Sequence, residues 1–290
     1  MTMRKEEYKA KIGAFVADLT GIERSENTIK KYRLVAERFS ESLPEGDITK
    51  ADVIAFKQAL IPKYKPSTIR NYITIANKFI RYCETDDIED KRSKSKLEVR
   101  QIPEQKRASV DNIFNDSEYQ RMLKAARNAG MDDMVLMMEI FAHTGIREQE
   151  LKDFTVEKLK NRTAIVTYSK GKMREIVIPQ SLKNRINKYI REKGIESGYL
   201  FPSPTDPDRL ISRFTVYKRL QKIAGLAKVR LSKSHAHSFR HMFAKKYAEM
   251  YPVESLADIL GHSSTETTRI YIKTNRDEKR EQLSSIKYRK

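Results

Sequence analysis

The sequence has a single cysteine, Cys83, and no long apolar run. One cysteine excludes an intrachain disulfide and a cysteine-rich zinc site. The longest apolar run, 134–138, ends at Glu139, and the N-terminus has no apolar stretch of the signal-peptide type. No segment is therefore predicted to span a bilayer. We expect a cytoplasmic protein with no membrane partner.

Positive charge is abundant. The 290 residues include 58 Lys+Arg against 39 Asp+Glu, which gives a formal net charge of +19. With 39% apolar residues the chain can build two domains with cores. A large positive charge on an ordered chain points to a polyanion, and nucleic acid is the commonest one. A merely soluble basic protein is the alternative.

The charge is unevenly placed along the chain. Segments 1–90, 91–107 and 108–290 carry net charges of +1, +5 and +13. Segment 91–107 has no helical or strand periodicity, so it is predicted to be an interdomain linker. It would either follow a phosphate backbone or act as a solvated spacer. Two longer stretches, 53–83 and 209–248, contain no acidic residue, which keeps one face of each domain free to approach phosphate.

Hydrophobic periodicity predicts a mainly α-helical protein with a small antiparallel β-sheet. β-branched runs at 163–168 and 174–178 flank a short polar turn and predict a hairpin. Apolar residues recur at helical spacing elsewhere. The predicted helices are 28–39, 49–60, 68–82, 117–129, 132–143, 148–154, 180–193, 211–224, 238–250, 253–260 and 265–273.

Four short motifs carry groups suited to phosphodiester cleavage without a metal. Two arginines can bind the non-bridging phosphoryl oxygens, and a lysine can protonate the leaving 5′ oxygen. A tyrosine is a nucleophile only with a neighbouring base and a cationic pocket, because its phenol pKa is about 10. Taken singly, each motif is more typical of a surface ion pair, a solvated turn or packing. The motifs are Thr144-Gly-Ile-Arg147, the hairpin lysine Lys170, His237-Ser-Phe-Arg240, and Leu260-Gly-His262 with Tyr271 on the next predicted helix.

At these motifs the sequence resembles the tyrosine recombinase, or phage integrase, family, which includes the Xer recombinases, Cre and lambda integrase. The matching segments read TGIREQE, YSKGKMREIVIP, HSFRH and LGHSSTETTRIY. The resemblance covers nearly the whole chain and implies a helical, SAM-like core-binding domain followed by an α+β catalytic domain. We therefore divide the chain into a core-binding domain (1–90), a basic linker (91–107), a catalytic domain (108–273) and a tail (274–290) that packs on a neighbouring protomer.

The resemblance also implies a role for each site residue. The implied roles are a phosphate clamp (Arg147 and Arg240), a general acid (Lys170, with Lys172 as the alternative), a proton-handling imidazole (His237), a second hydrogen-bonding imidazole (His262), the nucleophile (Tyr271) and an orienting acid (Glu150).

The implied reaction needs no cofactor. Tyr271 attacks a DNA phosphate to give a 3′-phosphotyrosyl link and a free 5′ hydroxyl, and a partner strand's hydroxyl reverses the step. The sequence lacks a GxxxxGK[ST] loop and a carboxylate cluster beside the motifs. The implied partners are a duplex recombination site and, in synapsis, a tetramer of this chain, with room for accessory or directionality factors.

DNA contact is predicted along the acid-free stretches, with the helix 67–82 meeting a major groove. The predicted contact residues are Lys65, Ser67, Thr68, Arg70, Asn71 and Lys78, then Arg92, Lys94 and Lys96 in the linker, and Arg213 and Lys218 in the catalytic domain.

Two other classes of function compete with this interpretation. His235, His237 and His241 could ligate zinc, but neighbouring Arg240 would repel a cation. A catalytically silent DNA-binding protein of the same fold is disfavoured because every expected catalytic position holds a competent residue.

The biological role divides into two alternatives. Core-binding helices begin almost at Met1, so we expect the form of the family without an arm-binding domain. Integration or excision of a mobile genetic element is favoured, and Xer-like resolution of chromosome or plasmid dimers is the alternative.

Overall fold

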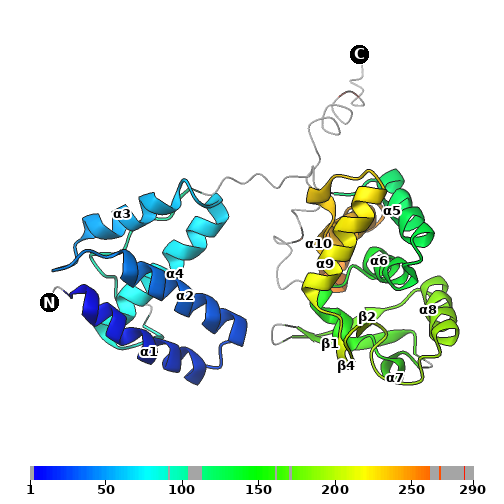
Figure 1. Cartoon of the computed structure of the whole chain (residues 1–290), viewed down its shortest axis with the longest axis horizontal. Coiled ribbons are helices and arrows are strands. Elements are labelled where there is room, and N and C mark those ends of the chain that lie inside the picture. The colour runs from blue at the N-terminus through cyan, green and yellow to red at the C-terminus, as the bar shows by residue number, and fades with distance from the viewer. Residues whose placement is uncertain are drawn as a thin grey trace, which may run out of the picture. The chain divides into compact units, whose positions relative to one another are not determined.

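The computed structural model divides into two compact units, Met1–Arg107 and Ala108–Lys290 (Figure 1). It describes residues 3–90, 92–103, 113–160, 162–169 and 172–261, together with Thr268 and Ser284. Within these ranges the protein is mainly α-helical with two small antiparallel sheets, as the periodicity predicts. No helix among the described residues has the length and apolar character needed to cross a membrane.

The first unit is a four-helix arrangement around an aromatic core. Phe15, Phe39 and Phe79 are fully buried, and Phe79 lies 5.0 Å from Phe15 and 6.5 Å from Phe39 between ring centroids. Pro66 begins the longest helix, where its missing N–H costs nothing. The described helices of this unit are α1 (Lys5–Gly21), α2 (Glu26–Ser42), α3 (Lys50–Leu60) and α4 (Pro66–Thr85).

The segment after α4 packs along that helix. Asn77 on α4 donates from Nδ2 to the carbonyl of Val99 (2.9 Å) and accepts from the Val99 N–H (3.1 Å). Arg81 pairs with Glu98 at 2.8 Å. Val99 is buried in the core of this unit. Residues 97–102 of the basic segment predicted as a linker are therefore fixed against the first unit.

The second unit is built around α6. This helix packs against α5, α8 and α10, and Phe239 of α10 lies 6.2 Å from Phe141 of α6 between ring centroids (Figure 1). The described helices are α5 (Asp116–Asn128), α6 (Asp132–Thr144), α7 (Val156–Leu159), α8 (Gln180–Lys193), α9 (Arg213–Leu226), α10 (Ala236–Met250) and α11 (Val253–Leu260), with short 3-10 helices η2 (Glu148–Asp153) and η3 (Leu231–Lys233).

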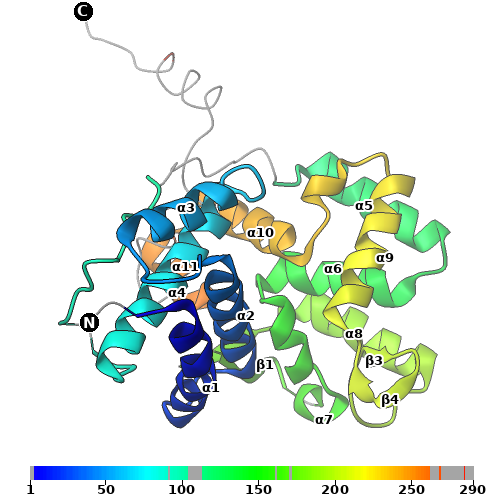
Figure 2. The same ribbon diagram turned by 60° about the vertical axis from the view of Figure 1, so that its left-hand side comes forward.

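Two hairpins complete the second unit. β1 (Ala164–Ser169) pairs antiparallel with β2 (Lys172–Val177), as predicted, with Thr167 opposite Arg174. Alternate residues of this hairpin face the core, where Ile165 and Ile176 are each 2% exposed. β3 (Pro202–Ser203) and β4 (Asp206–Leu210) form the second hairpin, which lies beside α8 (Figure 2).

Several elements differ from the sequence prediction. The pattern misses α1, α7, η3 and the β3–β4 hairpin. The segment 148–154, predicted as an α-helix, contains the 3-10 helix η2. The predicted helix 265–273 and tail 274–290 lie outside the described residues, apart from Thr268 and Ser284.

Candidate active site

Arg147 is placed by the sharp end of α6. The helix ends at Gly145, which has a left-handed φ of +59°. Two residues later Arg147 precedes η2, and its backbone N–H donates to Oε2 of Glu150 at 2.7 Å. This bond is the N-terminal capping contact of η2. The sequence expectation that a glycine turn projects Arg147 from the start of a helix agrees with this geometry.

Arg240 lies on α10 and is only 2% exposed. Its Nη1 donates to the carbonyl of Gly145 at 2.5 Å, and its Nη2 donates to the carbonyl of Leu260 at 2.8 Å. Arg240 therefore ties the C-terminal ends of α6 and α11 to α10. Its position is fixed by backbone carbonyls rather than by an acidic side chain in these bonds.

The two arginines converge on one turn. Nη2 of Arg147 contacts the carbonyl of Gly261 at 3.4 Å, next to the Leu260 carbonyl that Arg240 binds. Gly261 ends α11 with a left-handed φ of +61°. The structure thus brings together Arg147 and Arg240, which are far apart in sequence, on successive carbonyls.

Glu150 is the carboxylate shared by this cluster. It is buried, with a side chain 1% exposed, and it pairs with Arg147 Nη1 at 3.2 Å and with Arg174 Nη2 at 2.5 Å. Burial alone would raise the pKa of Glu150, but the hydrogen bonds and charges of Arg174 and then Arg147 hold it below its usual value. Glu150 therefore stays ionised and orients both guanidinium groups.

Three histidines lie at the start of α10. His235 caps the helix by accepting from the Ser238 N–H at 3.2 Å, and the rings of His237 and His241 are 6.1 Å apart. Desolvation first, and then the charge of Arg240, lower the pKa of His237. Desolvation lowers the pKa of His241 to about 4. The neutral imidazole is therefore the favoured form of both rings at neutral pH.

The remaining candidate catalytic residues lie outside the part of the chain that the structure describes. They are Lys170, His262 and Tyr271, and the side chain of Lys172, which begins β2, is likewise not described. Two of these residues adjoin described residues in the sequence. Lys170 stands between β1 and β2, and His262 directly follows Gly261.

The predicted DNA-contact residues divide by exposure. In the first unit Arg70 donates from Nη1 to the carbonyl of Ile102 at 2.8 Å, so this arginine contacts the segment along α4. Those exposed are Lys65, Ser67, Asn71, Arg92, Lys94, Lys96, Arg213 and Lys218, and those half-buried are Thr68, Arg70 and Lys78.

Two exposed aromatic residues extend the basic surface of α9. Phe214 is 67% exposed and Tyr217 is 47% exposed. Nζ of Lys218 lies 5.3 Å from the centroid of the Phe214 ring, and Arg213 pairs with Glu148 at 3.1 Å. We call Arg213, Phe214, Tyr217 and Lys218 the α9 patch. Glu148 directly follows Arg147 in the sequence. The patch therefore borders the arginine cluster, by which we mean Arg147, Glu150, Arg174 and Arg240.

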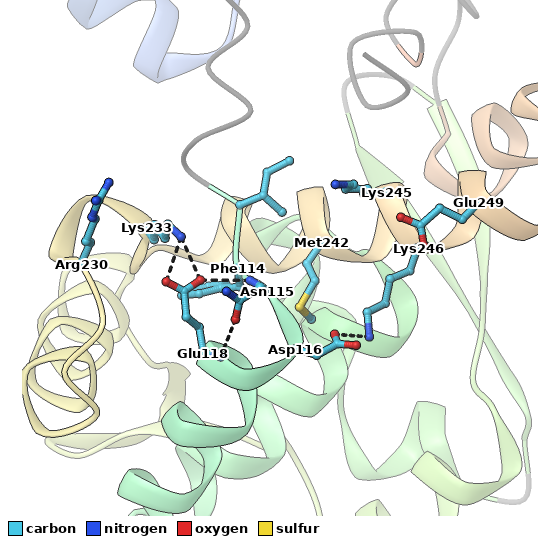
Figure 3. Close-up of a pocket in the computed structure, with 11 residues that line it drawn as sticks. Phe114, Asn115, Asp116, Glu118, Arg230, Lys233, Met242, Lys245, Lys246 and Glu249 are labelled. Atoms are coloured by element: carbon cyan, nitrogen blue, oxygen red, sulfur yellow. Dashed lines mark hydrogen bonds and ion pairs between the residues drawn. The ribbon is translucent and has the colours of Figure 1, made fainter. Parts of the chain in front are cut away.

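A separate cavity of about 560 Å³ lies between α5, η3 and α10 (Figure 3). Its charged residues are largely paired with one another. Lys233 binds Glu118 at 2.8 Å, and Lys246 binds Asp116. None of the residues of the arginine cluster lines it. The described residues also include no group of three or more His, Cys, Asp or Glu side chains that could hold a metal ion.

A match to a known family accounts for the motifs that form this cluster. Residues 112–278 match the model of the phage integrase family. The chain belongs to this family. It is a tyrosine-type site-specific recombinase, a class that cleaves and rejoins DNA.

Proteins named as tyrosine recombinases are similar to this one over most of the chain. The tyrosine recombinase XerA of Pyrococcus furiosus is 25% identical over 254 residues, covering 86% of this chain and 84% of that protein. XerD of Haemophilus ducreyi is 29% identical over 268 residues, covering 85% of this chain and 86% of that protein. A crystal structure of a lambda integrase tetramer bound to a Holliday junction has a TM-score of 0.75 at 16% identity, covering 93% of this chain and 77% of that one. The last likeness shows the recombinase fold.

Sequence reasoning missed Arg174 as a member of the arginine cluster. It lies in the quoted segment YSKGKMREIVIP, two residues before the buried Ile176. Alternation along the strand places Arg174 on the same face as the buried isoleucine, and a buried arginine usually has an acidic partner. This pattern could have predicted a buried ion pair. Phe214 and Tyr217 were missed as well, although both stand inside the acid-free stretch 209–248.

Proposed function

We propose that this recombinase cleaves and rejoins its DNA site through a 3′-phosphotyrosyl intermediate on Tyr271. The observation that carries the proposal is the convergence of Arg147 and Arg240 on the carbonyls of Gly261 and Leu260. Two guanidinium groups held at one place form a fork for the non-bridging oxygens of a single phosphate. The turn they share leads directly to His262 in the sequence.

In the proposed step the Tyr271 oxygen attacks phosphorus, and the bond from phosphorus to the 5′ oxygen breaks. The phenol proton passes to a base, for which we propose His237, and Lys170 gives a proton to the leaving 5′ oxygen. Arg147 and Arg240 offset the charge that develops on the phosphoryl oxygens. A 5′ hydroxyl from a partner strand reverses these transfers and rejoins the DNA.

The lowered pKa of His237 keeps its ring neutral, which is the form that can accept a proton. Desolvation first, and then the charges of Arg240, His235 and Arg147, favour the neutral ring, whose free nitrogen can accept a proton at neutral pH. Glu150 supports the clamp rather than the proton transfer, since its carboxylate is already bound by two arginines. His262 would be the second hydrogen-bond donor to the phosphate, and Lys172 stays the alternative to Lys170.

DNA would be held by both units. In the first, the exposed Lys65, Ser67 and Asn71 lie at the N-terminal end of α4. In the second, the α9 patch combines cations for phosphates with aromatic side chains suited to base edges. Thr68, Arg70, Lys78, Arg92, Lys94 and Lys96 complete the proposed contact set.

We propose that four copies of this chain act together on two duplexes. The similarity in fold to a lambda integrase that was solved as a tetramer on a Holliday junction supports this assembly. The tail 274–290 would contact a neighbouring copy.

Two biological roles are candidates. Integration or excision of a mobile element is the role we favour from the sequence, in which nothing identifies the fixed site of a host Xer protein. Resolution of chromosome or plasmid dimers is the second candidate, and the observation favouring it is that two relatives matching most of the chain are XerA and XerD. Sequencing DNA that is recovered covalently bound to the protein from cells separates them. Ends of a mobile element support the first role, and one fixed chromosomal or plasmid site supports the second.

The chemistry is tested on a duplex that carries the recovered site and a nick beside the scissile phosphate. The short leaving strand diffuses away, so the covalent protein–DNA adduct accumulates and is visible after denaturing electrophoresis. We expect the adduct with the wild-type chain and none with Tyr271→Phe. An adduct that persists in Tyr271→Phe would mean that another residue is the nucleophile.

A further inference from the structure

We propose that Arg174 is a positioning residue of the recombination site, which holds Arg147, the β1–β2 hairpin and the 259–261 turn in one fixed arrangement. The inference rests on the proposed function of Arg147 as a phosphate ligand. Arg174 itself does not touch the reacting atoms in this account: its side chain is 8% exposed and is engaged within the protein.

The first contact of Arg174 is a two-pronged pair with Glu150. Nε of Arg174 donates to Oε1 at 3.1 Å, and Nη2 donates to Oε2 at 2.5 Å. Oε1 of Glu150 also accepts from Nη1 of Arg147 at 3.2 Å, and Oε2 accepts from the Arg147 backbone N–H. Both carboxylate oxygens are therefore shared between the two arginines. The Arg174 fork fixes the plane of the carboxylate that orients Arg147.

The second contact of Arg174 is with the C-terminal end of α11, residues 259–261. Nη1 donates to the carbonyl of Ile259. Gly261 passes so close that a Cβ built on it would lie 2.6 Å from Cδ of Arg174. Arg240 and Arg147 bind the next two carbonyls, at 260 and 261. Three arginines thus bind three successive carbonyls, and Arg174 is the one that comes from the hairpin.

The third connection runs through β2 itself. Arg174 lies opposite Thr167 in the hairpin, and Thr167 donates from Oγ1 to Oδ2 of Asp153 at 2.6 Å. Asp153 ends η2, the helix that Glu150 belongs to. Both strands of the hairpin are therefore attached to η2, one by Thr167 and the other by Arg174. The turn between these strands contains Lys170.

Only an arginine can make these contacts together. Its planar guanidinium presents donors in several directions, so it can bind a carboxylate with two nitrogens and a carbonyl with the third. A lysine at this position keeps the charge but supplies one nitrogen, which cannot form the two-pronged pair with Glu150 and also replace the separate donor to Ile259. Arg174→Lys therefore removes the fork while it retains the cation beside the buried carboxylate.

The test compares Arg174→Lys with Arg219→Lys. Arg219 also forms a two-pronged pair with a carboxylate in the same unit, Asp133, but none of its hydrogen bonds joins the Arg147 cluster. For each variant the rate of adduct formation on the nicked duplex is measured at saturating protein, together with the dissociation constant for intact DNA. We expect Arg174→Lys to slow adduct formation by about 10- to 100-fold, because small displacements of reacting groups cost rates of this order. Its dissociation constant should change less than about threefold, and Arg219→Lys should keep the wild-type rate.

A double-variant cycle separates positioning from a general loss of structure. If Arg174 acts through Arg147, then Arg174→Lys should slow the enzyme far less in an Arg147→Lys background than in the wild type. Rate losses that multiply, or a wild-type rate in Arg174→Lys, would overturn the proposal. If the wild-type chain itself forms no adduct, it is the proposed function that fails.

Discussion

The backbone of Gly145 lies against the ring of Phe243. A Cβ built on Gly145 would lie 2.4 Å from Cδ1 of Phe243, which is far inside van der Waals contact. Gly145 ends α6, and its carbonyl accepts from Arg240. This close approach lets α10 bring its arginine to the end of α6, two residues before Arg147.

Gly145→Ala should therefore lower both stability and activity. Alanine at a left-handed φ costs about 1 kcal/mol, and here the methyl group must also displace the Phe243 ring. Gly194→Ala is a matched control, because Gly194 has a similar φ of +62° and no atom within 4 Å of its Cβ position. Thermal unfolding should show a larger loss in Gly145→Ala than in Gly194→Ala. Equal losses would show that the contact with Phe243 has no energetic role.

The histidine cluster should make the recombinase sensitive to acid. The pKa of His241 is lowered to about 4 by desolvation and then by His237, His235 and Arg240, whereas an unfolded histidine titrates near 6.5. A group with a lowered folded pKa binds its proton more tightly in the unfolded chain, so stability falls as pH drops from about 6.5 toward 4. The full shift corresponds to about 3 kcal/mol.

His241→Gln removes this titration. Its stability, measured from urea midpoints between pH 7.5 and pH 4.5, should fall less steeply with acid than that of the wild type, whatever the substitution costs at pH 7.5. Parallel pH curves would show that His241 is not held in its neutral form.

The α9 patch should contribute to affinity for the recombination site. Phe214→Ala and Tyr217→Ala should each weaken binding by about fivefold to tenfold, because an apolar contact with a base edge is worth about 1 kcal/mol. Leu226→Ala is the control, since Leu226 is 56% exposed on the last turn of the same helix and lies outside the patch. If Leu226→Ala weakens binding as much as the aromatic variants, the whole helix rather than the patch carries the effect.

The salt dependence of DNA binding tests α4. Each phosphate contact that is lost lowers the slope of log affinity against log salt by about 0.9. We expect this change in Lys65→Ala and in Arg70→Ala, and no change in Lys188→Ala, whose exposed side chain pairs with Glu192 on α8. An unchanged slope in Arg70→Ala would remove Arg70 from the interface and leave its hydrogen bond to Ile102 as its role.

The helices that the sequence predicts well have dense apolar faces. In α4 the buried Ile69, Ile73 and Ile80 recur at helical spacing, and the observed helix includes the predicted one. α1 is missed although its buried Tyr8, Phe15 and Leu19 and its partly buried Ile12 also recur at helical spacing. Its packing comes from contacts with α2 and α4, which a local pattern does not contain.

The candidate residues that stand in short motifs could be singled out from the sequence. Arg147 and Arg240 were found because a glycine turn and an HxxR spacing mark them in the sequence. Arg174 was missed because its partner Glu150 is 24 residues away on another element, so their pairing depends on the hairpin folding back onto η2. The convergence on three carbonyls at the C-terminal end of α11 is likewise a property of tertiary structure, since backbone acceptors leave no trace in the sequence.

The position of the covalent bond to DNA tests the central claim most directly. Trypsin cuts after Arg269 and after Lys273, so Tyr271 is released in the peptide 270–273. The purified adduct is digested with nuclease and trypsin, and the peptides are analysed by mass spectrometry. We expect a nucleotide joined through its 3′ phosphate to Tyr271 in this peptide. A nucleotide on any other peptide, or one joined through a 5′ phosphate, would show that Tyr271 is not the nucleophile that forms a 3′-phosphotyrosyl link.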